Sequence, residues 1–236
     1  MQTRIDNLVK WIRTQVPEGG KAILGISGGK DSTIAAALCV RALGKENVVG
    51  VMMPNGVQPD IDDSIKVCEA LDIRNVTINI AGAYDSLMAE LKEKMEEVTS
   101  QSIQNLPPRL RMSTLYAVSQ CVNGRVANTC NLSEDWVGYS TRYGDSAGDV
   151  SLLGKLTVQE VKALGHELGL PEKLVEKTPS DGLCGSTDEQ KLGFTYAVLD
   201  RYIRDGVCED KSVRRHIDTL HKQNKFKLEL IPTFEP

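Results

Sequence analysis

The stretch KAILGISGGKDSTIAAALCV, residues 21–40, decides the fold of this chain. A short apolar run with β-branched residues, 22–26, is followed by Ser-Gly-Gly-Lys-Asp-Ser and then by strong helix formers. This pattern predicts a buried strand, a tight turn and a helix that begins directly after the turn. The glycines and the aspartate at this junction raise the question of what the turn binds.

Gly28 and Gly29 occupy the predicted turn between the strand and the helix. Because neither has a side chain, the backbone can turn sharply and approach a ligand closely. The helix that follows presents unpaired N–H groups and the positive end of its dipole, which together suit phosphate or pyrophosphate. A plain tight turn, with Asp31 or Ser32 capping the helix, is the alternative that the glycines alone leave open.

The rest of the first half repeats this alternation of strand and helix patterns. Apolar, β-branched runs are separated by amphipathic segments of helix length, which is typical of βαβ units and a parallel sheet. Because such crossovers are right-handed, helices should cover both faces of the sheet. We therefore predict one α/β domain over 1–236, a Rossmann-like parallel sheet with helices on both faces and a helical C-terminal extension. The expected strands are 22–26, 47–54, 75–80 and 124–131. A helix should follow NLPPRLRM (105–112) and run to about 121, and the chain after the fourth strand should be helical, over 157–168, 194–204 and 209–224.

Composition and charge narrow the class of protein. The 236 residues carry a net charge of −4, which gives no basic surface for a nucleic-acid duplex but leaves a local patch for RNA open. No apolar run is long enough to span a bilayer, and the first 16 residues have helical rather than signal-peptide spacing. The six cysteines are scattered without a C-x-x-C pair, so we expect reduced core thiols. We predict a cytoplasmic protein that binds neither nucleic acid nor membrane.

Two common phosphate-binding loops do not match the turn. In G-x-x-x-x-G-K-[ST] four residues separate the glycines, whereas three separate Gly25 from Gly29, and Asp31 stands where the magnesium-binding hydroxyl belongs. The pattern G-x-G-x-x-G is absent as well. What remains, S-G-G-x-D-S after a strand and before a helix, resembles the signature of the ATP pyrophosphatase superfamily. The resemblance implies an adenine nucleotide alpha hydrolase-like fold and cleavage of ATP between its α and β phosphates.

Further segments narrow the resemblance to the ammonia-dependent NAD synthetases. In chain order they are PNGVQPDIDD (54–63), NLPPRLRM (105–112), NTCNLSEDWVGYSTRYGDSAGDVSLLGKLTVQEV (128–161), EKTPSDGLCGSTDEQKLGFTYAVLDRYI (176–203) and the His-Lys pair at 221–222. The resemblance implies an enzyme that amidates deamido-NAD⁺ with ammonia and ATP, giving NAD⁺, AMP and pyrophosphate through an adenylated dinucleotide. It also implies Mg²⁺ as cofactor, ATP as co-substrate and a homodimer with the dinucleotide site at its interface.

The expected site residues follow from the same resemblance, position by position. Asp31 and Glu134 would hold Mg²⁺. In the late loop, Asp181 and Asp188 could deprotonate incoming ammonium or merely cap turns, and we hypothesise from its place in TPSDGL that Asp181 helps to admit ammonia. The residues expected to bind deamido-NAD⁺ are Arg109, Arg142, Asp149, His221 and Lys222. The residues expected to bind ATP are Gly25, Ile26, Ser27, Gly28, Gly29, Lys30, Asp31, Ser32, Thr129 and Ser180.

Several of these positions have a simpler interpretation. Glu134 is also a carboxylate at a helix start, His221 an exposed helical histidine, and Lys30 a solvated side chain at the variable position of the motif. Val158 departs from the family, because many members have a lysine there that contacts ATP. Lys155, three residues earlier, is a candidate substitute.

Two rival functions remain beside NAD synthesis. A tRNA-modifying thiolase or lysidine synthetase also carries S-G-G-K-D-S, but such thiolases need reactive or cluster-binding cysteines, and an RNA enzyme needs a basic face. A nucleotide sensor that lost catalysis explains Val158 but not the presence of both Asp31 and Glu134. Because a glutamine-dependent enzyme needs a second domain with a nucleophile, we expect free ammonia, or ammonia from a separate partner, as the nitrogen source.

Overall fold

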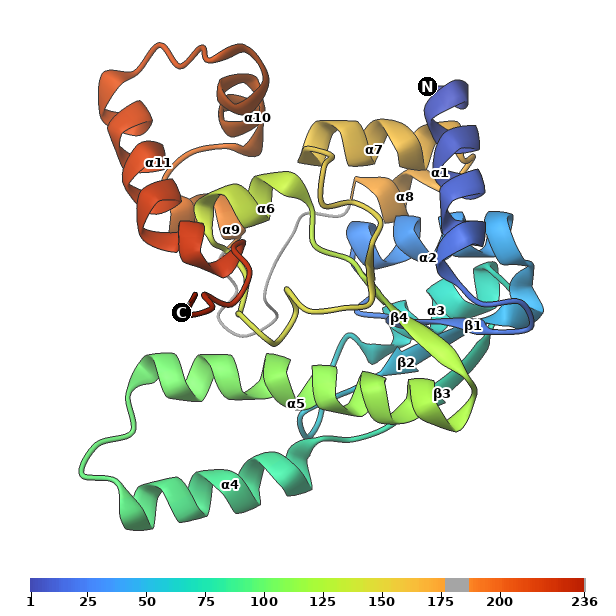
Figure 1. Ribbon diagram of the computed structural model, residues 1–236, viewed down its shortest axis with the longest axis horizontal. Coiled ribbons are helices and arrows are strands. Elements are labelled where there is room, and N and C mark those ends of the chain that lie inside the picture. The colour runs from blue at the N-terminus through green and yellow to red at the C-terminus, as the bar shows by residue number, and fades with distance from the viewer. Residues whose placement is uncertain (177–186, 236) are drawn as a thin grey trace.

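The computed structural model describes residues 1–176 and 187–235. Within these residues five parallel strands form one sheet in the order β3-β2-β1-β4-β5 (Figure 1). The chain extends the sheet from β1 through β2 to β3 and then returns to the other side of β1 with β4, so the strand order reverses between β1 and β4. Parallel sheets bind ligands at the carboxyl ends of the strands beside such a reversal. The strands are β1 (Lys21–Gly25), β2 (Val48–Met52), β3 (Arg74–Thr77), β4 (Gly124–Asn128) and β5 (Val150–Ser151).

The register of the central strands decides which residues meet at that edge. Lys21 pairs with Gly124, and Ile23 pairs with Val126. Continued for two residues, this register puts the end of β1 beside the end of β4. The turn after β1 and the segment after β4 therefore leave the sheet as neighbours.

Helices cover both faces of the sheet, as predicted. One apolar cluster joins the sheet to α1, α2, α3 and α7, and a second joins the opposite face to α5. In Figure 1, α5 lies on the other side of the sheet from α1 and α2. The bounds are α1 (Gln2–Gln15), α2 (Lys30–Leu43), α3 (Ile61–Ala70), α4 (Ala81–Lys94), α5 (Ser100–Cys121), α7 (Val158–Glu167) and α8 (Glu172–Val175).

The predicted helical C-terminal extension is confirmed, and it has its own apolar cluster. This cluster contains Val137, Leu199 and Ile217 and also takes in Val158 at the start of α7. It lies beside the end of β4 because α6 follows that strand directly. None of the helices within 1–176 and 187–235 has the length and apolar character needed to cross a bilayer. The helices of the extension are α6 (Leu132–Val137), α9 (Asp188–Leu192), α10 (Tyr196–Asp205) and α11 (Lys211–Asn224).

Two local predictions were wrong. The two prolines at 107–108 lie inside α5 rather than before it. Proline removes a helical hydrogen bond, but here Thr99 caps the first turn and Met112 and Leu115 pack on the sheet, so both flanks of the prolines are held. The segment after β4 is also not entirely helical, since β5 adds a two-residue strand that is too short to show a periodic pattern.

Candidate active site

The turn between β1 and α2 is shaped around Gly28. Its φ of +74° lies in the left-handed region that favours glycine. A Cβ at this position would lie 3.0 Å from the Cβ of Asp63 and 3.1 Å from the backbone N of Ser64, both in α3. Any side chain here would therefore strain the turn and push against α3.

Hydroxyl groups close the turn and leave the start of α2 open. The Oγ of Ser27 accepts a hydrogen bond from the N–H of Gly29 at 3.3 Å and lies 3.2 Å from the Oγ of Ser32. Ser32 Oγ in turn donates to the carbonyl of Gly29 at 3.1 Å. Gly29 is the N-cap of α2, and no side chain of the described residues caps this helix. Capping by Asp31 or Ser32 is thus not the role of either residue, and the first-turn N–H groups face the place where an anion would bind.

Gly25 and Ile26, both predicted to bind ATP, face the protein. The side chain of Ile26 is buried in the core, and its N–H donates to the carbonyl of Val51 at 3.0 Å. A Cβ on Gly25 would lie 3.2 Å from the side chain of Met53. Any contact of these two residues with ATP is therefore limited to their remaining backbone atoms.

Lys30 is a buried cation rather than a solvated one. Its side chain is 1% exposed, and its Nζ lies 2.7 Å from Oδ2 of Asp31. Burial acts to lower the pKa of the Lys30 ammonium, but the carboxylates of Asp31, Glu134 and Asp188 outweigh it and raise the pKa. A positive charge is thus fixed in the first turn of α2, and the solvated interpretation of Lys30 is wrong.

Asn131, at the start of α6, connects the two predicted metal ligands. It is fully buried, and its Oδ1 accepts from the N–H groups of Ser133 and Glu134 at 3.0 and 3.1 Å. Its backbone N–H donates to Oε2 of Glu134 at 3.3 Å, which completes a capping box. Its Nδ2 donates to Oδ1 of Asp31 at 3.2 Å. One side chain therefore caps α6 and holds a carboxylate of α2 against it.

The two carboxylates fit a magnesium ion. Burial and the neighbouring Asp31 carboxylate raise the pKa of Glu134 well above its ordinary value, and the Lys30 ammonium offsets this effect only in part. Within 1–176 and 187–235, no three His, Cys, Asp or Glu side chains are grouped to hold a metal by themselves. Two hard oxygen ligands suit Mg²⁺, which usually takes one or two carboxylates and completes its shell with phosphates and water.

Replacing Asn131 with Ala is expected to weaken both the helix start and the carboxylate pair. Loss of the cap should lower the free energy of unfolding by about 1–2 kcal/mol. Because Asp31 also loses its hydrogen bond, the Mg²⁺ concentration that gives half-maximal turnover should rise several-fold. Thr157→Ala is the matched control, since Thr157 caps α7 with the same capping box. We expect it to cost similar stability in chemical unfolding without changing the Mg²⁺ dependence; an equal shift in both variants would contradict the role of Asn131.

The residues predicted for the dinucleotide fall into two places. Arg109 of α5 donates through Nε to the carbonyl of Arg142 at 3.2 Å, so these two arginines lie together. The guanidinium of Arg142 also lies 5.4 Å from the ring centroid of Phe226. His221 of α11 stacks on Trp136 at 4.1 Å and its Nδ1 lies 2.8 Å from the Trp136 carbonyl, which fixes α11 against α6. Its imidazole is therefore not an exposed group, and a role in substrate binding stays a prediction, as for Lys222.

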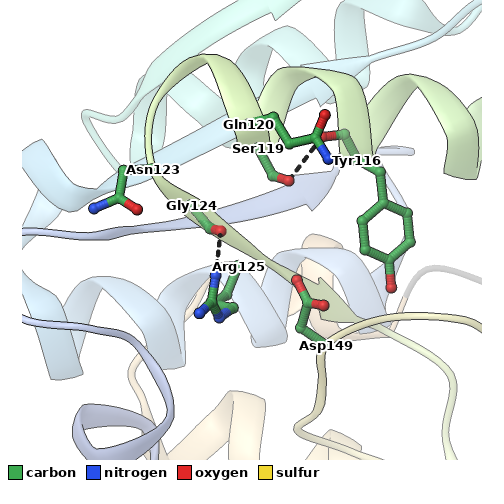
Figure 2. Close-up of a pocket in the computed structure, with 7 residues that line it drawn as sticks. All are labelled: Tyr116, Ser119, Gln120, Asn123, Gly124, Arg125 and Asp149. Carbon is green, nitrogen blue, oxygen red and sulfur yellow. Dashed lines mark hydrogen bonds between the residues drawn. The ribbon is translucent and has the colours of Figure 1, made fainter.

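Asp149 lies in a separate cavity of about 460 Å³ along β4. Figure 2 shows that the cavity is lined by side chains of α5, β4 and the segment before β5. One carboxylate oxygen of Asp149 accepts from the N–H of Val126 at 2.8 Å, and Tyr116 of α5 lines the same cavity. The cavity has the volume of a small-molecule site.

Comparisons with known proteins agree with this geometry. The family model described as NAD synthase matches residues 4–231. The chain belongs to the NAD synthase family. An NH(3)-dependent NAD(+) synthetase from Archaeoglobus fulgidus is 38% identical over 97% of this chain and 94% of its own length. Among solved structures, NMN synthetase from Francisella tularensis aligns with a TM-score of 0.90 at 32% identity, covering 98% of this chain and 97% of that one. The NH3-dependent NAD synthetase from Campylobacter jejuni aligns with a TM-score of 0.80 at 29% identity, over 99% of each chain.

One residue of the candidate site in this NAD synthase family chain was not predicted from the sequence, and two predicted residues lie outside the described part of the structure. Asn131 was not predicted as a site residue, although an Asn at a helix start is a signal that could have indicated it. Thr129 lies half-buried at the end of β4, where it was expected. Ser180 and Asp181 lie outside the described residues.

Val158, which stands where many members of the family have a lysine, packs into the protein. Val158 is buried in the cluster of the C-terminal extension, and its N–H donates to the Oγ of Ser133 at 3.1 Å. Lys155 is exposed, and its charge acts on the nearby Asp135 carboxylate. Whether Lys155 replaces the missing family lysine stays a prediction.

Proposed function

We propose that this chain makes NAD⁺ from deamido-NAD⁺, ammonia and ATP, releasing AMP and pyrophosphate. The observation that carries the proposal is the uncapped helix start at Gly29 beside a carboxylate pair joined by Asn131. A helix start of this kind binds phosphates, and the pair suits the metal that accompanies them. The NAD synthase family and its NH(3)-dependent relatives supply the identity of the acceptor and the nitrogen source.

In the proposed reaction, some residues bind the substrates and others stabilise their charge. The turn from Ser27 to Ser32 would take the triphosphate, with the Lys30 ammonium close to its charge. Asp31 and Glu134 would hold Mg²⁺, which neutralises phosphate charge when bound. The nicotinate carboxylate attacks the α-phosphorus and pyrophosphate leaves; ammonia then attacks the acyl carbon and AMP leaves. Because no protein nucleophile takes part, the enzyme acts by positioning and by electrostatic stabilisation.

The cavity at Asp149 supports a dinucleotide rather than a mononucleotide as acceptor. It reaches Gly124, at the amino end of β4, whereas ATP would bind beyond the carboxyl end of the strand. The five residues of β4 span about 16 Å at the usual rise per residue. A dinucleotide carries a second nucleoside that can occupy a site at this distance from the reacting carboxylate.

A mononucleotide acceptor is the second candidate function. The structural similarity to NMN synthetase from Francisella tularensis, with a TM-score of 0.90, favours it. That enzyme's name gives nicotinamide mononucleotide as the product, and the corresponding acceptor would be nicotinic acid mononucleotide. The same phosphate turn and carboxylate pair would serve either acceptor.

The two functions are separated by measuring the activity of the chain with each acceptor in turn. The purified chain, ATP, Mg²⁺ and ammonium are incubated with each acceptor, and kcat/KM is measured from product formation. We expect deamido-NAD⁺ to be preferred at least tenfold, with a Tyr116→Ala variant losing most of that preference because the cavity is opened. A preference for the mononucleotide would replace the proposed acceptor, and no amide from either would remove the proposed reaction.

Assembly and location are further proposals. We infer a homodimer from the family resemblance, with Arg109 and Lys222 on exposed surfaces where a second copy could complete the dinucleotide site. The chain would act as one catalytic unit in the cytoplasm, where thiols stay reduced. The five described cysteines are all free thiols, which supports this location. We also propose that nitrogen arrives as free ammonia or from a separate partner.

A further inference from the structure

The end of α11 packs directly on the end of α6. Gly138 is the C-cap of α6, and its φ of +70° lies in the left-handed region that favours glycine. A Cβ at Gly138 would overlap the side chain of Asn224, the last residue of α11. Asn224 Nδ2 donates to the carbonyl of Val137 at 3.3 Å and to that of Leu220 at 2.9 Å. The chain beyond α11 therefore starts beside the loop that follows α6.

Lys227 joins the loop after α6 to the C-terminal segment, residues 225–235. Its Nζ donates to the carbonyl of Gly138 at 2.7 Å and to that of Ser140 at 2.9 Å. A cation is favoured at this position, because the end of a helix has unpaired carbonyls and the negative end of the dipole. Lys227 thus uses two of its three N–H donors on the backbone of this loop.

Arg142, two residues beyond Ser140, is held by the same segment. Its guanidinium donates through Nη2 to the carbonyl of Glu229 at 3.3 Å. The guanidinium carbon lies 5.1 Å from the ring centroid of Tyr143 and 5.4 Å from that of Phe226, which is within the range of cation–π contacts. The C-terminal segment therefore holds both the guanidinium of Arg142 and the backbone before it.

Helix α5 holds the same loop through two further hydrogen bonds. Arg109 Nε donates to the carbonyl of Arg142 at 3.2 Å, and Thr141 Oγ1 donates to Oδ1 of Asn105 at 2.9 Å. In Figure 1 the C-terminal segment runs from α11 towards the amino-terminal half of α5. The loop that carries Arg142 therefore lies between these two elements.

Arg109 and Arg142 bring two positive charges together. In the part of the chain that the structure describes, neither guanidinium forms an ion pair with a carboxylate. Guanidinium groups suit phosphates and carboxylates, and deamido-NAD⁺ carries two phosphates and a carboxylate. The place of this arginine pair should therefore affect the dinucleotide, whereas the phosphate turn and the carboxylate pair for Mg²⁺ lie on other elements.

We propose that Lys227 positions Arg142 and, through it, Arg109 for the dinucleotide; this inference rests on the proposed amidation of deamido-NAD⁺. Lys227 is a positioning residue, because its ammonium bonds the backbone of the loop and acts on the substrate through Arg142. Without that ammonium the carbonyls of Gly138 and Ser140 lose their donor, and the loop loses an attachment just before Arg142.

Lys227→Met keeps most of the length of the side chain and removes the ammonium. In steady-state assays of NAD⁺ formation, we expect the KM for deamido-NAD⁺ to rise about tenfold, because a displaced binding group loses much of its effect. The kcat and the KM for ATP should stay within about twofold, since a loss of binding alone changes KM. Phe226→Leu is a second variant, which removes a ring from Arg142 and should raise the same KM about threefold.

Lys225→Met is the matched control. Lys225 lies two residues before Lys227, and its Nζ lies 3.5 Å from Oε1 of Glu229 in an exposed ion pair. The substitution removes the same charge from the same segment but no bond to the loop after α6. We expect the KM for deamido-NAD⁺ to stay within about twofold of the wild-type value. An equal rise in Lys225→Met and Lys227→Met would assign the effect to the charge of the segment and overturn the proposal.

A double-mutant cycle measures whether Lys227 acts through Arg142. Arg142→Ala should raise the KM for deamido-NAD⁺ by itself. Adding Lys227→Met to Arg142→Ala should raise it by less than about twofold more, because the side chain that Lys227 positions is already absent. If the two effects multiply in full, Lys227 acts independently of Arg142 and the proposal is overturned.

The outcomes separate this inference from the function on which it rests. If the wild type makes NAD⁺ and Lys227→Met changes the KM for deamido-NAD⁺ by less than about twofold, the positioning role alone is overturned. If neither acceptor is amidated, the proposed reaction fails, and titration calorimetry with deamido-NAD⁺ decides the inference. A Kd about tenfold higher in Lys227→Met would then support the positioning role. Equal affinities, or no binding to the wild type, would overturn it.

Discussion

Replacing Glu134 with Gln is expected to lower turnover by about 10²–10³-fold, since a metal contributes several kcal/mol of charge stabilisation. The substitution keeps the size of the side chain and an oxygen that accepts the N–H of Asn131. It removes one of the two negative charges that would hold Mg²⁺. Steady-state assays of NAD⁺ formation over a range of Mg²⁺ concentrations measure the effect, which more metal should reverse only in part.

The same substitution should leave the fold intact. Burial and the neighbouring Asp31 carboxylate raise the pKa of Glu134, so a charge on this side chain is disfavoured in the metal-free protein, and the neutral Gln removes that cost. We therefore expect the free energy of unfolding without Mg²⁺ to stay the same or to increase. Glu93→Gln, on the exposed surface of α4, is the control and should change neither quantity. A Glu134→Gln enzyme with more than a third of wild-type turnover would contradict a role in metal binding.

Replacing Lys30 with Met is expected to destabilise the metal-free protein by about 3–5 kcal/mol, the usual cost of breaking a buried ion pair. The substitution leaves the carboxylates of Asp31 and Glu134 without their nearest cation. For a chain of this size, the melting temperature should fall by roughly 6–20 °C. Added Mg²⁺ should return part of the loss, because it restores positive charge to the same carboxylates.

An exposed ion pair provides the comparison for Lys30. Lys45 pairs with Asp72 on the surface, where both side chains are more than half exposed. Lys45→Met should therefore cost less than about 1 kcal/mol. Folding raises the pKa of Lys30 above its ordinary 10.5, so its contribution is present at neutral pH and is lost only as the pH rises through that raised value. Equal losses in the two variants, measured by urea unfolding at neutral pH, would show that the burial of Lys30 has no energetic consequence.

The sheet and its covering helices were predictable because their patterns are local. The strand over 22–26 and the helix after Gly29 differ in residue type and in period, so each is visible in a short window. The prolines of α5 were misleading, because the packing of Met112 and Leu115 on the sheet lies outside any such window. The strand β5 was missed, because two residues define no period.

The candidate site was predictable in its residue types more than in its electrostatics. The resemblance indicated Asp31 and Glu134, but the charges that act on Lys30 include Glu134 of α6 and Asp188 of α9, which come more than 100 residues later. Asn131 contacts Asp31 across 100 residues of sequence, a contact that spacing does not reveal.

The most direct test of the account follows the oxygen atoms of the acceptor. The purified chain is incubated with ATP, Mg²⁺, ammonium and deamido-NAD⁺ labelled with ¹⁸O in its nicotinate carboxylate, and the products are analysed by mass spectrometry. If the phosphate turn and the Asp31–Glu134 pair activate the carboxylate by adenylation, NAD⁺, AMP and pyrophosphate form in equal amounts and AMP carries one ¹⁸O. Formation of ADP and phosphate, or of AMP without the label, would contradict that chemistry.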